Sequence, residues 1–411
     1  MTWDISFADI EAAAVRGRSV VLTTPTLPSP SFSRLSDSDI WLKAEHLQRT
    51  GSFKIRGAMN AIGSLSTAEL GRGVVAASAG NHAQGVALAA SEIGTDATVF
   101  MPESAAIPKI VATKAYGATV VLEGSTLAEA TDSATTFASR TGAALIHPYD
   151  DPQVIAGQGT LGIEVLEQVP DVETIVIPVG GGGLIGGSAL AIKHLNPAVR
   201  IVGVQSAAVP TYVQARRNGS PAEITPGFTI ADGIAVSRPS PTCFDLIERF
   251  VDDLITVDDQ MTTEAVALLL ERAKYLVEPS GAVGIAAILN ALIPTEGKTV
   301  TVLSGGNIDL LLLDGVVRHG LEARGRFGSL VVTLPDEPGH LARVMTLIGD
   351  SGANVLSVDH HREGAGLDFG KVEIHISCET RSADHFEEIV TSLGDYEVVA
   401  TQLGRGKGSK E

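Results

Sequence analysis

The chain has 411 residues, which at roughly 150 residues per domain is enough for two or three domains. Its 30 Lys and Arg residues stand against 48 Asp and Glu residues, a formal net charge of −18, and only 4% of its residues are aromatic. An acidic chain that has no basic tract and few stacking side chains is not expected to bind nucleic acid.

Composition and cysteine content indicate a folded protein of a reducing compartment. Hydrophobic residues make up 44% of the chain and charged residues 19%, which suits a large buried core rather than disorder. The two cysteines, Cys243 and Cys378, form neither a disulfide framework nor a metal-ligand spacing. The apolar stretch 282–293 is shorter than the ~18 residues that a membrane helix needs, and the N-terminus lacks the layout of a signal peptide. We therefore expect a cytoplasmic protein without a membrane partner.

Strands and helices are predicted to alternate over the first three quarters of the chain. Short apolar runs predict strands at residues 73–77, 97–101, 119–122, 144–147, 173–179 and 201–204. Between these runs, helices are expected at 82–92, 107–116, 127–140, 153–169 and 184–195. Strands that are apolar on both faces and separated by helices indicate parallel sheets, so the predicted fold class is α/β.

The pattern changes after residue 325. Four strands are expected at 329–334, 354–360, 369–378 and 396–401. Two helices are predicted by apolar residues at i, i+3, i+4 and i+7, which are Leu341, Val344, Met345 and Ile348 in one and Phe386, Ile389, Val390 and Leu393 in the other. The resulting order, β-α-β-β-α-β, is the ferredoxin-like arrangement, so a second domain is expected here.

A run of glycines is the sharpest local feature. Gly180-Gly181-Gly182-Gly183-Leu184-Ile185-Gly186 follows a predicted strand and opens a predicted helix. Consecutive glycines let main-chain N–H groups converge on an anion, and the helix N-terminus adds positive potential, so we favour a phosphate cradle over a tight turn. A dinucleotide site would need an acidic residue after the strand 201–204, but Gln205-Ser206 stand there, which argues against NAD.

A lysine stands at another predicted helix start, in the segment Ser52-Phe53-Lys54-Ile55-Arg56-Gly57-Ala58. The positive end of a helix disfavours a cation and lowers the pKa of an amine, which suits an amine that forms a Schiff base. The alternative is an ordinary solvated lysine, and the residues alone leave both possibilities open.

Two further loops come directly after predicted strands. Ser78-Ala79-Gly80-Asn81-His82-Ala83-Gln84-Gly85 opens a helix that can hold a carboxylate, but on these residues alone simple capping by Ser78 or Asn81 is the favoured interpretation. Ser304-Gly305-Gly306-Asn307 places a hydroxyl at the carboxyl end of a strand, where α/β proteins bind ligands, or forms a plain turn.

Two groups of polar residues are given structural interpretations. Glu278-Pro279 is typical of a helix start, with proline in the first turn and an acid near the positive end, so a site role for Glu278 is secondary. His360, His361 and His375 lie on strands, where adjacent residues point to opposite faces, so they are expected to be surface residues and not metal ligands.

In this order and spacing, S-F-K-I-R-G-A, S-A-G-N-H-A-Q-G, G-G-G-G-L and S-G-G-N resemble the pyridoxal-phosphate enzymes of the tryptophan-synthase-β fold, most closely the threonine ammonia-lyases. The resemblance covers residues 5–320. It implies two parallel-sheet subdomains, the smaller at about 50–150, a homodimer or homotetramer, and the conversion of L-threonine, or L-serine, to a keto acid and ammonia. Serine dehydratases and serine racemases share these motifs, and a sensor built on an inactive enzyme is a further alternative.

The resemblance also implies roles for single residues. Lys54 matches the Schiff-base lysine, which then removes the Cα proton. The residues matched to cofactor contacts are Phe53 at the ring, Asn81 at its 3′ oxygen, Ser304 at its pyridine nitrogen, and the phosphate cup Gly180, Gly181, Gly182, Gly183 and Leu184. The substrate carboxylate is expected at Ser78, Gly80 and His82.

Two departures from the relatives narrow the activity. Ala79 stands where racemases of this family carry a serine that returns the proton to Cα, which favours elimination of the β-hydroxyl over racemisation. Some relatives bind a divalent cation through acidic residues after the strand 201–204. This chain has no acid at 205–210, so we expect no such metal site.

The C-terminal part resembles an ACT domain, a regulatory module that binds amino acids. Its first loop is matched by L-P-D-E-P-G-H-L at 334–341 and the start of its second strand by G-A-N-V at 352–355. In that family the two places meet at a domain–domain interface, so Asp336 and Asn354 are the expected effector contacts, with isoleucine or valine as ligand. A structural domain with an empty site is the alternative. The expected layout is a catalytic domain at 1–320, a linker at 321–327, the ACT domain at 328–403 and a disordered tail at 404–411.

Overall fold

The computed structural model describes residues 4–294, 297–322, 325–362 and 367–401. The chain divides into two compact units, Met1–Asp309 and Leu310–Glu411. Helix α14 (Leu310–Glu322) groups with the second unit because it packs against β11 (Phe327–Pro335), although its residues fall mostly inside the range 1–320 expected for the first domain. The predicted tail at 404–411 lies outside the described residues.

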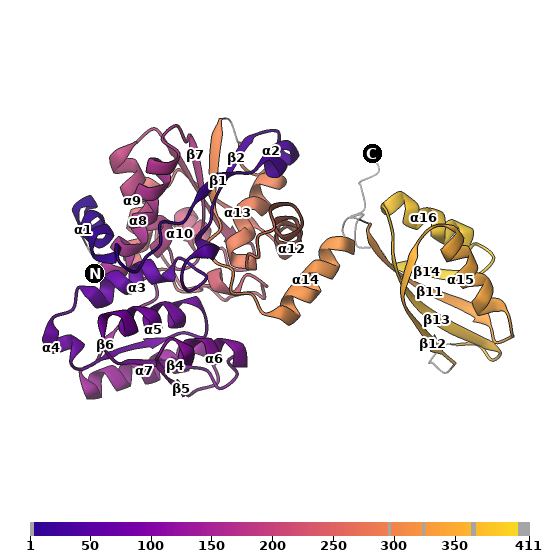
Figure 1. Cartoon of the computed structure of the whole chain (residues 1–411), viewed down its shortest axis with the longest axis horizontal. Coiled ribbons are helices and arrows are strands. Elements are labelled where there is room, and N and C mark those ends of the chain that lie inside the picture. The colour runs from indigo at the N-terminus through magenta and orange to yellow at the C-terminus, as the bar shows by residue number, and fades with distance from the viewer. Residues whose placement is uncertain (1–3, 295–296, 323–324, 363–366, 402–411) are drawn as a thin grey trace. The chain divides into compact units, whose positions relative to one another are not determined.

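The larger part of the first unit is a sheet of six strands in the order β1-β2-β10-β7-β8-β9. All neighbours run parallel except β1 and β2. Figure 1 shows helices on both sides of these strands, with α8 and α9 on one side and α12 and α13 on the other. The strands are β1 (Thr26–Pro28), β2 (Asp39–Lys43), β7 (Thr174–Pro178), β8 (Arg200–Ser206), β9 (Asp253–Val257) and β10 (Lys298–Val302).

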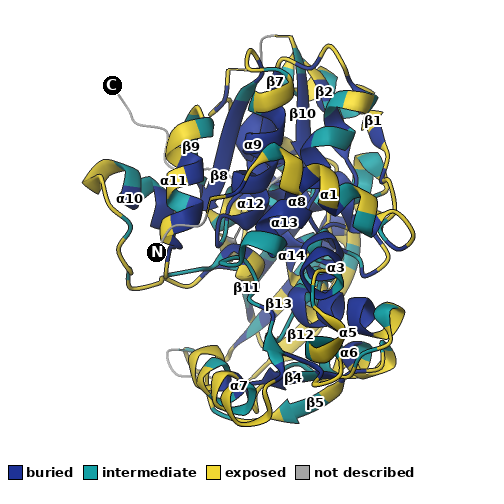
Figure 2. Ribbon diagram, turned by 90° about the vertical axis from the view of Figure 1, so that its left-hand side faces the viewer, coloured by how far each residue is buried: buried dark blue, intermediate teal, exposed yellow. Residues whose placement is uncertain are grey.

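Helices bury the central strands of this sheet completely. Every residue of β7 is buried, as are all but the first of β8 and β10, and Figure 2 shows them within a buried layer. The helices of this part are α1 (Phe7–Gly17), α2 (Pro30–Ser36), α8 (Pro152–Gln168), α9 (Gly183–Leu195), α10 (Thr211–Asn218), α11 (Pro241–Phe250), α12 (Asp259–Leu268) and α13 (Pro279–Leu289).

A smaller parallel sheet, in the order β5-β4-β3-β6, forms the second subdomain of this unit. Its strands are β3 (Val74–Ala77), β4 (Ala97–Met101), β5 (Thr119–Leu122) and β6 (Ala144–Leu145). Its helices are α3 (Lys54–Gly63), α4 (Thr67–Leu70), α5 (Asn81–Ile93), α6 (Ile107–Ala115) and α7 (Leu127–Thr141). The predicted α/β class and its alternation of strands and helices are confirmed, and most element ends shift by one or two residues.

The second unit has the predicted β-α-β-β-α-β order. An antiparallel sheet, β12-β13-β11-β14, packs against α15 and α16 through a core that includes Val332, Val344, Ile374 and Ile389. Its elements after β11 are α15 (His340–Asp350), β12 (Asn354–His361), β13 (Lys371–Glu379), α16 (Ala383–Ser392) and β14 (Glu397–Thr401). In neither unit does the described part of the chain contain a helix that is long and apolar enough to cross a membrane.

A buried cluster of four charges ties the start of α3 to the large sheet. The guanidinium of Arg56 donates to Glu45 Oε2 at 2.7 Å and to Glu164 Oε1 at 2.7 Å. Lys43 Nζ lies 2.7 Å from Glu164 Oε2. Burial is the largest single influence on the pKa of Glu45 and would raise it, but the charge and hydrogen bonds of Arg56 together with the charge of Lys43 and the hydrogen bond from Thr24 outweigh burial, and the pKa is lowered. Because Arg56 lies two residues after Lys54, this cluster anchors the helix that carries Lys54.

Glu45→Gln should destabilise the first unit strongly. The change leaves two buried cations, Arg56 and Lys43, with Glu164 as their one charged partner within the cluster, and breaking a buried pair costs about 3–5 kcal/mol. Urea unfolding followed by fluorescence measures the loss. The matched control is Glu92→Gln, which removes a half-exposed pair with Arg49 and should cost less than about 1 kcal/mol. Equal effects of the two changes would mean that the buried cluster is not a special anchor.

Candidate active site

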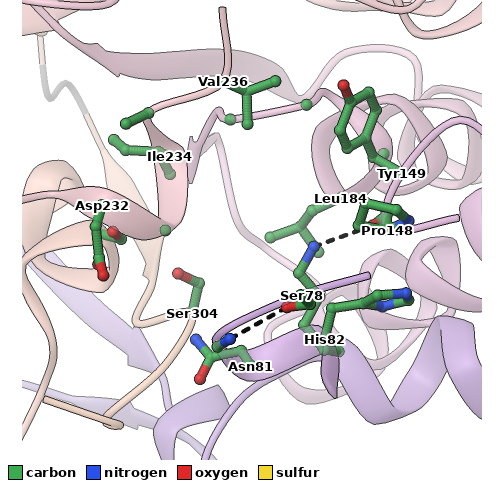
Figure 3. Close-up of a pocket in the computed structure, with 18 of the residues that line it drawn as sticks. Ser78, Asn81, His82, Pro148, Tyr149, Leu184, Asp232, Ile234, Val236 and Ser304 are labelled. Carbon is green, nitrogen blue, oxygen red and sulfur yellow. Dashed lines mark hydrogen bonds between the residues drawn. The ribbon is translucent and has the colours of Figure 1, made fainter. Parts of the chain in front are cut away.

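A cavity of about 340 Å³ lies between the two subdomains of the first unit and collects all four motifs. Figure 3 shows Ser304 and Asn81 on one side of it, His82 and Tyr149 on another, and Asp232, Ile234 and Val236 along its rim. The motifs are far apart in the sequence and meet here because each follows the carboxyl end of a parallel strand or starts a helix beside it.

Lys54 is the first residue of α3 and faces this cavity. Its amine donates to the carbonyl of Pro148 at 3.0 Å (Figure 3) and lies 5.1 Å from the centre of the Phe53 ring. Burial lowers the pKa of Lys54 to about 8, while the charge of Glu278 acts in the opposite direction. The sequence attributed a lowered pKa to the helix N-terminus, but burial is the largest cause. An amine with this pKa is partly neutral near pH 7 and can act as nucleophile and base.

The glycine run forms the loop between β7 and α9, and it has no room for side chains. A Cβ at Gly181 would overlap the ring carbons of Tyr149, and one at Gly182 would lie 2.7 Å from Cys243 Cβ. Gly182 also has a φ of +89°, which a residue with a side chain rarely adopts. The bare main-chain N–H groups therefore stay available to an anion at the N-terminus of a 13-residue helix.

A buried tyrosine holds this glycine loop in place. The hydroxyl of Tyr212 donates to the carbonyl of Gly181 at 2.8 Å and accepts the N–H of Ser240 at 3.1 Å. Gln205, at the position where a dinucleotide site would need an acid, accepts the N–H groups of Tyr212 and Val213 and so caps α10. Gln205 is therefore a structural partner of the tyrosine that supports the loop.

The loop before α5 is not explained by simple helix capping. The N-cap is Gly80 and no side chain caps the helix, so the capping interpretation of Ser78 or Asn81 is wrong. The hydroxyl of Ser78 instead accepts the N–H of Gly80 at 3.1 Å (Figure 3). Burial lowers the pKa of His82 to about 3, and its Nε2 lies 2.8 Å from the carbonyl of Ile146. His82 is therefore neutral, and a carboxylate here would be bound by the N–H groups of the loop and helix.

The segment after β10 contributes Ser304 and Asn307 to the site, where Asn307 meets Asn81 and Asn81 meets Glu278. Ser304 is buried in the cavity wall and its carbonyl accepts the N–H of Phe53 at 3.1 Å. Asn81 donates to Glu278 Oε1 at 2.7 Å and accepts from Asn307 at 2.7 Å. Burial raises the pKa of Glu278 to about 7, and the charge of Asp232 adds to this effect. Glu278 thus lies in the site, a role that the sequence placed second because Glu-Pro is typical of a helix start.

Several other cavity residues carry no signal in the sequence. Lys109 of α6 and Asp232 form an ion pair at 3.2 Å between the two subdomains, and Tyr149 covers the glycine loop. Gln158 and Ser280 also line the cavity, and within the described chain their Oε1 and Oγ atoms are buried without a hydrogen-bond partner. None of these residues belongs to the four motifs, so only the fold places them here.

The cavity fits pyridoxal phosphate. The glycine loop offers bare N–H groups to a phosphate, Lys54 offers an amine of lowered pKa to an aldehyde, and Ser304 and Asn81 add polar groups to the lining of the same cavity. Across the described residues, no group of three His, Cys, Asp or Glu side chains could hold a metal ion.

The two expected effector residues lie at opposite ends of the sheet in the second unit. The N–H of Asp336 donates to the carbonyl of Gly370 at 2.9 Å, beside the start of β13, whereas Asn354 pairs with Glu379 at its end. The 9 residues of β13 separate them by roughly 26 Å at ~3.3 Å per residue. One copy of the domain therefore does not bring Asp336 and Asn354 together.

Comparison with known proteins identifies both units. Residues 18–305 match the family described as "Pyridoxal-phosphate dependent enzyme", and residues 328–397 match the ACT domain. The L-threonine ammonia-lyase of Thermotoga maritima is 45% identical over 396 residues, which are 96% of this chain and 99% of that protein. A maize serine racemase has a similar structure, with a TM-score of 0.74 and 35% identity over 78% of this chain and 99% of that one. Processed threonine deaminase isoform 2 from Solanum lycopersicum has a TM-score of 0.73 and 35% identity, over 76% and 86%.

Gly181→Ala should weaken pyridoxal-phosphate binding sharply, and Gly181→Asp should weaken it further. The added Cβ would overlap the Tyr149 ring and distort the loop, and a carboxylate would repel the phosphate in a poorly screened site. Titration of the apoenzyme with the cofactor, followed by absorbance, gives the affinity. Gly349→Ala is the control, because a Cβ at Gly349 meets nothing within 4 Å. Unchanged affinity in the Gly181 variants would place the phosphate elsewhere.

Proposed function

Since the chain belongs to the family of pyridoxal-phosphate-dependent enzymes and carries a C-terminal ACT domain, we propose that it is a threonine ammonia-lyase that converts L-threonine to 2-oxobutanoate and ammonia. The observation that carries the proposal is the 45% identity to an L-threonine ammonia-lyase over 96% of this chain, which includes both units. The cavity supports it, because it brings together an amine of lowered pKa, a glycine loop for a phosphate and a second loop for a carboxylate.

The residues of the cavity have separate tasks in this reaction. The glycine loop would hold the cofactor phosphate, and Lys54 would hold its aldehyde. Once the substrate amine takes the place of Lys54 at the aldehyde, the released Lys54 amine would be free to take the proton from Cα. Bound pyridoxal phosphate supplies the electron sink that makes this proton removable. The loop at Ser78, Gly80 and His82 orients the substrate carboxylate through N–H groups. Ser304 lines the cavity and would meet the cofactor ring with a hydroxyl that adds no charge.

Elimination is favoured over racemisation at this site. A racemase needs a second group that returns a proton to Cα on the face opposite Lys54. Ala79 lines the cavity at the position where related racemases carry a serine, and its methyl group has no proton to give. The likeness to a serine racemase structure keeps racemisation as the second candidate, and formation of D-serine from L-serine would reveal it.

The second unit is proposed to bind an amino acid that regulates the enzyme, with isoleucine or valine as the ligand. Asp336 and Asn354 are exposed, as ligand contacts on a domain surface must be, but they lie at opposite ends of one sheet. A complete site therefore requires Asp336 from one copy and Asn354 from another. This supports a homo-oligomer, and the two buried free cysteines suit a reducing cytoplasm.

Lys54→Ala should abolish the release of 2-oxobutanoate from L-threonine, because the cofactor loses its covalent anchor and the substrate its base. A keto-acid assay with the holoenzyme measures this, with L-serine as a parallel substrate. Lys114→Ala, at an exposed position of α6, is the matched control and should keep wild-type turnover. A wild-type enzyme that binds pyridoxal phosphate but releases no keto acid from either substrate would contradict the proposed activity.

Isoleucine or valine should shift the threonine saturation curve of the full-length enzyme. Coupling between two sites is typically about 5–150-fold in affinity. Asn354→Ala should reduce the shift and leave activity without effector unchanged, because Asn354 belongs to the second unit. Thr346→Ala, exposed on α15, is the control. Kinetics that ignore both amino acids would contradict this assignment of the effector.

A further inference from the structure

Glu278 occupies the place of a helix cap without acting as one. It is the N-cap of α13, yet its side chain makes no capping hydrogen bond. It is 6% exposed, and its Oε1 accepts from Asn81, a residue of the other subdomain, at 2.7 Å. Gly305 makes this contact possible, because a Cβ at that position would overlap Glu278 Oε1. The helix start therefore explains the position of Glu278 in the chain but not the direction of its carboxyl.

The hydrogen bonds around Asn81 fix which way its amide points. Asn307 donates through Nδ2 to the main-chain carbonyl of Thr50 at 2.7 Å and to Asn81 Oδ1 at 2.7 Å. A main-chain carbonyl can only accept, so the orientation of Asn307 is set, and Asn81 must present its oxygen to it. The Nδ2 of Asn81 then has two hydrogens, one of which goes to Glu278. A flipped Asn81 would place donor against donor at Asn307 and oxygen against oxygen at Glu278.

Three charged groups from three different elements act on the Glu278 carboxyl. Asp232 of the 3-10 turn Asp232–Ile234 raises its pKa, while Lys109 of α6 and Lys54 of α3 lower it. Burial is the largest influence and brings the pKa to about 7. The carboxyl therefore changes its charge near neutral pH, at hydrogen-bond distance from the side chain assigned to the cofactor ring.

We propose that Glu278 is a positioning residue that orients the side-chain amide of Asn81 toward the bound cofactor and couples its own ionisation to the cofactor through that amide. The second hydrogen of Asn81 Nδ2 is the one that remains for the 3′ oxygen of the ring. An ionised Glu278 holds the shared amide more strongly than a neutral one, because hydrogen bonds to charged groups are the stronger kind. The proposal rests on the function proposed above and on the role of Asn81 in it.

Three variants of the full-length holoenzyme test the proposal. Glu278→Gln keeps an oxygen that accepts from Asn81 but cannot ionise. Glu278→Ala removes the acceptor, and Asn307→Asp replaces the donor on the other side of Asn81 with an acceptor. Glu11→Gln, exposed on α1, is the matched control. The readouts are the affinity for pyridoxal phosphate, the pH dependence of the visible absorbance of the bound cofactor, and thermal unfolding.

The wild type and the control should show a spectral transition near pH 7. Glu278→Gln should bind the cofactor normally and lose the transition. Glu278→Ala and Asn307→Asp should each weaken cofactor binding by about tenfold, the value of one hydrogen bond. If Glu278→Ala does not fold, the other two variants still decide. A transition that persists in Glu278→Gln, or normal cofactor affinity in both Glu278→Ala and Asn307→Asp, would overturn the proposal. A wild type that binds no pyridoxal phosphate would instead contradict the proposed function.

Discussion

The catalytic unit depends on a short main-chain contact between two loops that lie far apart in the chain. The N–H of Gly306 donates to the carbonyl of Gly51 at 2.8 Å, and the N–H of Phe53 donates to that of Ser304 at 3.1 Å. Ser52 and Gly305 form an isolated β-bridge between these bonds. This main-chain contact holds the start of α3 beside the segment after β10, and so it brings Lys54 and Ser304 to the same cavity.

Burial acts in opposite ways on the charges inside and beside the cavity. The four charges of the cluster around Arg56 pack against partners of opposite sign, and these partners lower the pKa of Glu45 in spite of its burial. Among the described residues no carboxylate is hydrogen-bonded to Lys54, so burial moves its pKa down to about 8, and burial moves the pKa of Glu278 up to about 7. Burial therefore has two results. The paired charges around Arg56 anchor α3, whereas Lys54 and Glu278, which line the cavity, can exchange protons near neutral pH.

The second unit differs from the first, because the effector site proposed for it is not complete in one chain. Its core is formed by one face of the sheet and two helices, which leaves the other face and the edge strand β12 exposed. Asp336 and Asn354 lie at the two ends of this arrangement. β11 and β12 lie on either side of β13 and run in the same direction. Asp336 follows the end of β11 and Asn354 begins β12, so the two residues must lie at opposite ends of the sheet.

The sequence alone was enough to predict the fold class and the two-part organisation and to locate the four motifs, because hydrophobic periodicity and runs of glycine are local signals. Lys54, the glycine run and Ser304 could be selected in this way, with the resemblance to a family deciding between the open alternatives. The position of Glu278, the cover that Tyr149 provides and the pairing of Lys109 with Asp232 were decided only by the tertiary structure. These contacts join elements that are distant in the chain, and no local pattern records which of them will meet. The pKa values in the cavity were also decided only by the tertiary structure, because burial is a property of the folded chain and not of any residue within it.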